Sequence, residues 1–174
     1  MTGEELLNKL LQSYRRSFDV TEDFKVGDVS YDAYAKFNVT GTKYVLIKKA
    51  ELWRAHCFEH TFFLKSDSLS VDTLNTFAKQ VTEIIEPVFV REGARYPVPD
   101  HMYTYVTGIF ISESAVTDEV RKFIRKYHYL KNYLLSVRGY CESRIVLFDL
   151  ESGKVYGNPA ARLLIKGYKK IDLA

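Results

Sequence analysis

The segment that most constrains the fold is residues 102–112, whose second half is nearly continuously apolar (Val-Thr-Gly-Ile-Phe-Ile). Its β-branched and aromatic residues favour a strand, and the run is far shorter than the roughly 20 residues of a membrane-spanning helix. A strand with apolar residues on consecutive positions is typical of a sheet centre that is buried on both faces. We therefore predict that this segment is a central strand.

The N-terminal segment, residues 1–18, is predicted to contain a helix over residues 4–17. Thr2 is a suitable N-cap, and acidic residues follow it in the first turn. The apolar residues recur at helical spacing on one stripe. They are Leu6, Leu7, Leu10, Leu11 and Tyr14. The polar stretch 19–28 is predicted to be a loop.

Three strands are predicted next, over residues 29–39, 43–53 and 57–65. The first shows strict alternation of apolar and polar residues, which places one face in the core and leaves the other wetter. The boundary between the second and third strands lacks Gly, Pro or Asn. Residues 50–64 therefore also admit a helical interpretation, and the sequence leaves this choice open.

A second helix is predicted over residues 71–86, because apolar residues recur at helical spacing and Pro87 should end it. Residues 87–101 hold three prolines and a glycine, so we expect a long irregular loop of the kind that is often functional. A third helix should begin after Thr117 and run towards Tyr133.

The C-terminal part is predicted to add strands at residues 143–150 and 155–156 and a short helix at 160–166. The element order is then α-β-β-β-α-β-α-β-β. A front half rich in hairpins followed by strand–helix–strand predicts a mixed sheet. We expect one α+β domain spanning residues 1–174, with about five or six strands and three main helices.

Composition excludes several classes of protein. The chain has 174 residues, a net charge of +3 and two cysteines, Cys57 and Cys141. These values predict a globular protein, neither a disulfide scaffold nor a strongly basic nucleic-acid binder. With no signal peptide or membrane span in the sequence, a cytoplasmic location is expected. The partner and the oligomeric state are left open, a homo-oligomer included.

Two resemblances bear on function. His101–Ser112 together with residues 127–150, which include Arg-Gly-Tyr-Cys-Glu-Ser-Arg-Ile-Val-Leu-Phe-Asp-Leu, resembles an uncharacterised bacterial family. The element order is also similar to that of restriction-endonuclease-like nucleases. That second resemblance implies acidic metal ligands on the early strands, but Thr61 stands where the family pattern has a lysine after Glu59.

Two functions follow from these observations. The first is a non-enzymatic cytosolic binding or interaction domain that needs no cofactor, and the nuclease-like resemblance implies for it a catalytically inactive member of that fold. The alternative is a divalent-metal-dependent phosphodiesterase or nuclease. It would use three carboxylates on the early strands, namely Asp32, Glu51 and Glu59.

Residues His56-Cys-Phe-Glu59-His60 match the H-x-x-E-H pattern of zinc proteases. That chemistry requires a helix, because only a helix places residues four apart on one face. The flanking residues favour a strand, in which the two imidazoles would lie about 13 Å apart. We therefore predict no metal site here.

The third predicted helix carries a basic ridge, which we define as Arg121, Lys122, Arg125 and Lys126. Tyrosines lie nearby in sequence, and tyrosines among cations are typical of sites for nucleic acid or another anionic partner. The simpler interpretation is the solvated face of an amphipathic helix.

Three isolated residues have simpler structural interpretations. Cys141 is expected to be a half-buried structural cysteine and His101 a surface residue beside the 87–101 loop. Asp149 is expected to begin the turn that follows its strand.

Overall fold

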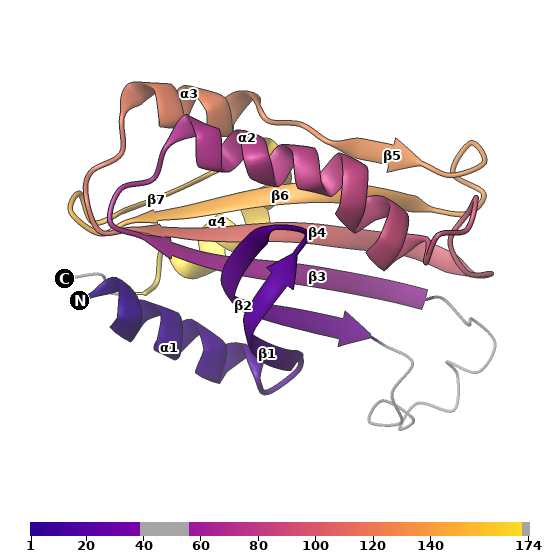
Figure 1. Ribbon diagram of the computed structural model, residues 1–174, viewed down its shortest axis with the longest axis horizontal. Coiled ribbons are helices and arrows are strands. Elements are labelled where there is room, and N and C mark those ends of the chain that lie inside the picture. Colours follow the sequence, from indigo (N-terminus) through magenta and orange to yellow (C-terminus); the bar gives the residue numbers. More distant parts are fainter. Residues whose placement is uncertain (39–55, 172–174) are drawn as a thin grey trace.

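The computed structural model describes residues 1–38 and 56–171 of the chain (Figure 1). In chain order the elements are α1 Gly3–Tyr14, β1 Asp19–Val26, β2 Val29–Asn38, β3 His56–Ser66, α2 Val71–Gln80, the π-helix η3 Val81–Val90, β4 His101–Ser112, α3 Asp118–Lys126, β5 Leu130–Asn132, β6 Tyr140–Asp149, β7 Lys154–Gly157, the 3-10 helix η4 Pro159–Ala161 and α4 Arg162–Tyr168. The predicted α+β class with a mixed sheet is confirmed.

The described strands form one seven-stranded sheet in the order β1-β2-β3-β4-β6-β5, with β7 also paired to β6. The first three strands run antiparallel, whereas β3, β4 and β6 run parallel. The short strands β5 and β7 pair antiparallel with different parts of β6. The sheet thus has one strand more than the upper end of the predicted range.

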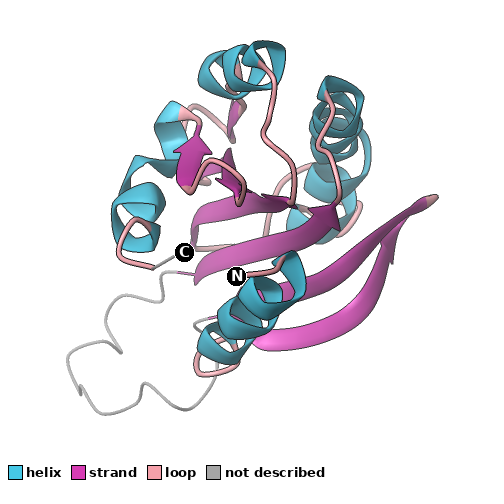
Figure 2. Ribbon diagram, turned by 90° about the vertical axis from the view of Figure 1, so that its left-hand side faces the viewer, coloured by secondary structure: helices cyan, strands magenta, loops and turns pink. Residues whose placement is uncertain are grey.

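Helices pack on both faces of this twisted sheet (Figures 1 and 2). The core on one face joins the sheet to α2, η3 and α3, through side chains such as Phe62, Leu74 and Ile124. The core on the other face joins it to α1 and α4, through side chains such as Leu10 and Phe63. As predicted, β4 is central, and it is buried almost continuously from Val106 to Ser112.

The segment 19–28, predicted to be a loop, is instead largely the edge strand β1. Only one of its eight residues, Val26, is fully buried, so the polar composition hides the strand pattern. A two-residue turn joins β1 to β2, and Gly27 adopts a φ of 56° there. This conformation favours glycine, which explains the tight turn at this position.

The second predicted helix does not end at Pro87. Its α-helical part stops at Gln80, and the chain continues as the π-helix η3 to Val90 with Pro87 inside it. The wider winding of a π-helix avoids the i−4 clash that a proline causes in an α-helix. The predicted loop over 87–101 is therefore reduced to a turn region over 91–100.

The third helix is shorter than predicted and ends at Lys126. The chain then turns into the three-residue strand β5, which the sequence did not indicate. The C-terminal elements agree with the prediction, since β7 and the short helix α4 follow β6. The predicted strand 43–53 lies outside the described residues.

Candidate functional site

The basic ridge of α3 is exposed to solvent for three of its four residues. Val120 and Ile124 are buried against the core, so the opposite face of the helix points outwards. The guanidinium of Arg121 already has partners, because it forms an ion pair with Asp118 and donates a hydrogen bond to the backbone oxygen of Val116 at 2.9 Å. Lys122, Arg125 and Lys126 are exposed. The predicted ridge therefore consists of one arginine in a local ion pair and three exposed cations that form no ion pair among the described residues.

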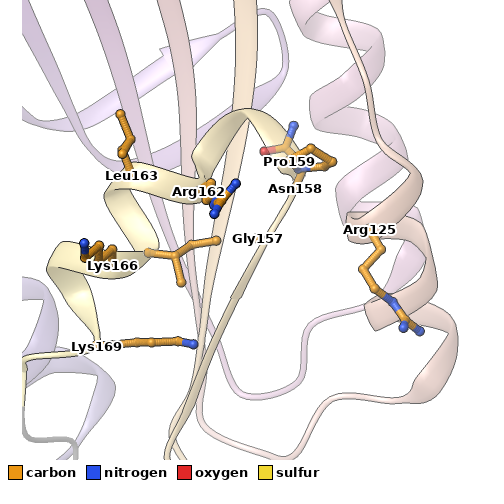
Figure 3. Close-up of a pocket in the computed structure, with 9 residues that line it drawn as sticks. Arg125, Gly157, Asn158, Pro159, Arg162, Leu163, Lys166 and Lys169 are labelled. Carbon is orange, nitrogen blue, oxygen red and sulfur yellow. The ribbon is translucent and has the colours of Figure 1, made fainter.

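A groove lies where α3, β7 and α4 meet, and its volume is about 800 Å³ (Figure 3). We call it the basic groove. The side chains that matter for its charge are Arg125 from α3, Arg162 and Lys166 from α4, and Lys169, which caps the C-terminus of α4. Figure 3 shows Arg162 and Lys166 along α4 with Lys169 at its end, and Arg125 on the other side of the strand with its side chain directed away from them. Arg125 is the one residue of the predicted ridge that lines this groove.

The fold brings these two helices together through Asn158, which is buried at the end of β7. Its side-chain oxygen accepts a hydrogen bond from the backbone of Ile145 at 2.9 Å. Its amide group donates to the backbone oxygens of Ser143 at 3.1 Å and of Tyr127, just after α3, at 3.3 Å. One amide side chain therefore fixes the end of α3, the strand β6 and the start of η4.

Gly157 allows α4 to approach β7 closely. A Cβ atom at this position would lie 2.6 Å from the Ile165 Cδ1 atom and 2.7 Å from the backbone oxygen of Ile145. Both distances are shorter than van der Waals contact, so a larger residue would push α4 away from the strand. The groove therefore depends on a glycine at its floor.

The basic groove carries positive charge that no carboxylate in its lining offsets, although the charge of Arg125 acts on Asp118 along α3. Arg162, Lys166 and Lys169 are spaced to lie on one side of α4. No carboxylate lines the groove, and none of its four cations forms an ion pair within residues 1–38 and 56–171. A second hollow, lined by Lys154 and Lys169, continues along β7. This arrangement can hold an extended anion.

The two predicted acidic residues that the structure describes, Asp32 and Glu59, are not brought together. Asp32 accepts a hydrogen bond from the backbone of Lys65 at 2.6 Å. Glu59 lies six residues before Lys65 on β3, which corresponds to about 20 Å along the strand. Glu51 lies outside the described residues. In the part of the chain that the structure describes, no three His, Cys, Asp or Glu side chains are grouped to hold a metal ion.

The H-x-x-E-H segment is part of strand β3, as predicted. Successive side chains on a strand point to opposite faces. His60 accordingly contacts Tyr34 and Phe89 on the α2 side, whereas Glu59 influences Tyr14 of α1 on the other side. The segment therefore lacks the helical geometry that this zinc motif requires.

The isolated residues that the sequence singled out are all structural. Cys141 is fully buried rather than half-buried, and burial raises the pKa of its thiol to about 12. Asp149 accepts a hydrogen bond from the backbone of Ser152 at 2.9 Å, as expected of a residue that begins a turn.

His101 is not on the surface as expected. It is buried, and its ring nitrogens lie 2.8 Å from the Arg138 backbone oxygen and 2.8 Å from the Thr104 hydroxyl. The turn region ends at residue 100, so His101 is the first residue of β4, where it pairs with His56 of β3. This pairing places His101 in the sheet and not on the surface.

Sequence reasoning missed the α4 half of the basic groove. The short predicted helix at 160–166 contained two of its three cations, but they are more than 35 residues away from Arg125 in the chain. The available signal was the spacing Arg162, Lys166 and Lys169, which places three cations on one side of a helix.

Comparison with known proteins identifies one family. A family model described as "Domain of unknown function (DUF8052)" matches residues 2–170, nearly the whole chain. No curated protein and no solved structure matches the chain. Within the described residues, no helix has the length and apolar character needed to cross a bilayer.

Proposed function

The chain belongs to the DUF8052 family, and we propose that it is a non-enzymatic domain whose basic groove binds single-stranded nucleic acid through its phosphates. The observation that carries this proposal is that four cations, from α3, α4 and the C-cap of α4, line one groove that no carboxylate lines. Unpaired cations repel one another, so an anion in the groove relieves an existing electrostatic cost.

The mixture of side chains favours phosphate. The guanidinium groups of Arg125 and Arg162 are suited to bidentate hydrogen bonding with phosphate oxygens, and the two lysines add point charges. The groove also continues along β7 to Lys154, so its charge follows a line rather than a single point. A linear polyanion uses such a line better than a single small anion does.

Binding without catalysis is supported by the chemistry of the groove. Its lining offers positive charge and the exposed apolar side chain of Leu163, with no carboxylate, imidazole or thiol to transfer a proton or attack a substrate. We place this function in the cytoplasm. The support is that Cys57 and Cys141 are both free, as in proteins of a reducing compartment.

The test is the salt dependence of oligonucleotide binding. A fluorescently labelled 20-nucleotide poly-dT strand is titrated with the protein at several salt concentrations, and the same is done for a variant carrying Arg162→Gln, Lys166→Gln and Lys169→Gln. We expect the variant to bind at least tenfold more weakly at low salt. Its slope of log affinity against log salt should be shallower by about 2, since each phosphate contact on a single strand contributes roughly 0.7.

The matched control removes the same charge elsewhere, through Arg16→Gln, Lys25→Gln and Arg95→Gln, all exposed residues outside the groove. The control should bind nearly as well as the unmodified protein. If both variants lose the same amount of oligonucleotide affinity, only the net charge of the protein matters, and the basic groove is not the binding site. Tight binding of poly-glutamate without binding of the oligonucleotide would overturn nucleic acid as the partner.

A further inference from the structure

A second polar surface lies on the sheet face that carries α1 and α4, beyond the apolar core. It consists of Glu59 on β3, Tyr103 and Tyr105 on β4, and Tyr140 and Arg144 on β6, and we call it the tyrosine face. The register places Tyr103 beside Tyr140 and Thr107 beside Arg144 on the parallel strands β4 and β6. All five residues of the tyrosine face are half-buried, so each remains accessible in part.

Arg144 is incompletely satisfied. Its guanidinium lies over the ring of Tyr105, with the central carbon 3.1 Å from the ring centroid. Its Nε atom is buried and has no hydrogen-bond partner among residues 1–38 and 56–171. A guanidinium has five N–H donors in a planar fork, and a buried donor without an acceptor has a free-energy cost. The described residues therefore leave part of the hydrogen-bonding capacity of Arg144 unused, and the residue as a whole is only half-buried.

Glu59 is short of donors. Its Oε1 atom accepts hydrogen bonds from the hydroxyls of Thr107 at 2.9 Å and Thr61 at 3.4 Å. Burial raises the pKa of this carboxyl, and the Thr107 hydrogen bond and the charge of Arg144 offset that effect only in part. Although Arg144 is close enough to act on Glu59, the two do not form a direct ion pair within the described part of the chain.

Three tyrosine rings lie next to these two charged groups. Tyr103 and Tyr105 are 4.7 Å apart between centroids, and Tyr103 stacks on Tyr140 at 6.1 Å. The hydroxyls of Tyr105 and Tyr140 are 3.1 Å apart. Accessible aromatic rings on adjacent central strands provide flat surfaces on which a planar ligand can stack.

We propose that the tyrosine face binds a nucleobase, with guanine preferred. A base stacks on the tyrosines, its acceptor atoms receive hydrogen bonds from Arg144, and its N–H groups donate to Glu59. Guanine presents the acceptors O6 and N7, to which arginine binds in a bidentate manner, and it also carries an amino donor. The inference rests on residues that do not line the basic groove, so it holds or fails separately from the groove.

The test uses uncharged nucleosides, which have no phosphate for the groove to bind. Guanosine, adenosine, cytidine and uridine are titrated into the full chain, and binding is followed by calorimetry and by the NMR signals of the tyrosine rings. We expect guanosine to bind most tightly, with a dissociation constant that changes less than twofold between low and high salt. The signals of Tyr103, Tyr105 and Tyr140 should shift.

Two variants test the assigned contacts, and two serve as controls. Arg144→Gln and Glu59→Gln should each weaken guanosine binding about tenfold, since a bidentate base contact is worth that much discrimination. The control Glu83→Gln, an exposed carboxylate on η3, and the groove variant of Arg162, Lys166 and Lys169 should bind guanosine normally. Circular dichroism verifies that each variant is folded.

Three outcomes would overturn the inference. They are the absence of saturable nucleoside binding, equal binding by folded Arg144→Gln or Glu59→Gln protein, and shifts confined to residues of the basic groove. If the unmodified protein binds the oligonucleotide but does not bind guanosine, the tyrosine face is rejected as a nucleobase site, and the proposal for the basic groove is unaffected. If the unmodified protein binds guanosine but not the oligonucleotide, only the proposal for the basic groove is rejected.

Discussion

At the scale of single residues, the buried imidazole of His60 makes stability depend on pH. His60 is 2% exposed, and the Tyr34 hydroxyl lies 2.6 Å from its Nδ1 atom. Burial, aided by the charge of Lys36, lowers the pKa of His60 to about 4 from an ordinary 6.5. The folded chain therefore resists protonation that the unfolded chain accepts, and this group's contribution to stability is full above pH 6.5 and falls as the pH drops towards 4.

We expect the free energy of unfolding to fall by about 3 kcal/mol between pH 7 and pH 4 on account of His60, since each pKa unit corresponds to about 1.4 kcal/mol. The variant His60→Asn keeps a polar atom near Tyr34 and removes the titration. Urea unfolding at a series of pH values should show a flatter profile for the variant. Parallel profiles would contradict the assignment, and His128→Asn, which replaces an exposed histidine, is the control.

At the scale of elements, the π-helix η3 is joined to β5 through the buried carboxylate of Glu86. It accepts hydrogen bonds from Arg91 Nε at 2.6 Å, from Lys131 Nζ at 2.8 Å and from the Tyr133 hydroxyl at 2.8 Å. Burial alone would raise the pKa of Glu86, but these three donors outweigh it and lower the pKa. The charged carboxylate thus stabilises the fold above its ordinary pKa near 4.5, and that contribution is lost as the pH falls below it.

The variant Glu86→Gln should lower the free energy of unfolding at pH 7 by roughly 2–3 kcal/mol, since hydrogen bonds to charged groups are lost. This loss is smaller than the roughly 3–5 kcal/mol that breaking a fully buried ion pair costs, because Arg91 and Lys131 retain some contact with water. Chemical denaturation measures the difference, and Glu83→Gln on the exposed side of η3 is the matched control. A loss no larger than that of the control would show that Glu86 does not hold η3 in place.

The same elements show what the sequence can predict. The helix α1 and the strands β2 and β4 are predictable because their own residues carry a clear apolar pattern. For residues 50–64, which include most of β3, the sequence left the choice between strand and helix open, and the described part of this segment is a strand. β1 was missed because an edge strand with one buried residue has hardly any pattern. β5 has only three residues and forms through its pairing with β6, so its own sequence carries too little pattern to predict it. The continuation of η3 past Pro87 is also not visible locally, because Glu86 in η3 binds partners more than 40 residues away in the chain.

The candidate sites follow the same physical rule. Arg125 was predicted as part of a local run of cations, but the groove also needs α4, and only the tertiary fold brings α3 and α4 to the same groove. The sequence grouped Glu59 with Asp32 and Glu51 on the early strands, and it gave no sign of the neighbours that Glu59 has in the fold. Its neighbours Thr107 and Arg144 come from β4 and β6, and their positions follow from strand register.

At the scale of the whole molecule, the seven-stranded sheet is shared by two cores, one on each face. Leu10 of α1 lies in one core and Leu74 of α2 in the other, with exposures of 2% and 0%. If residues 1–174 fold as one domain, damage to either core should weaken a single cooperative transition. Leu10→Ala and Leu74→Ala should each lower the free energy of unfolding by about 2–5 kcal/mol.

The double variant makes this prediction sharper. Because the two leucines lie on opposite faces of the sheet and share no core, their effects should add to within about 0.5 kcal/mol. Circular dichroism of the backbone and tyrosine fluorescence should report the same transition in every variant, and Leu135→Ala, at a residue that is 97% exposed, should leave it unchanged. The shared sheet couples the two cores only while its central strands β3, β4 and β6 stay paired. Two separate transitions in the Leu10→Ala protein would therefore show that the α1 side unfolds independently of the rest of the sheet.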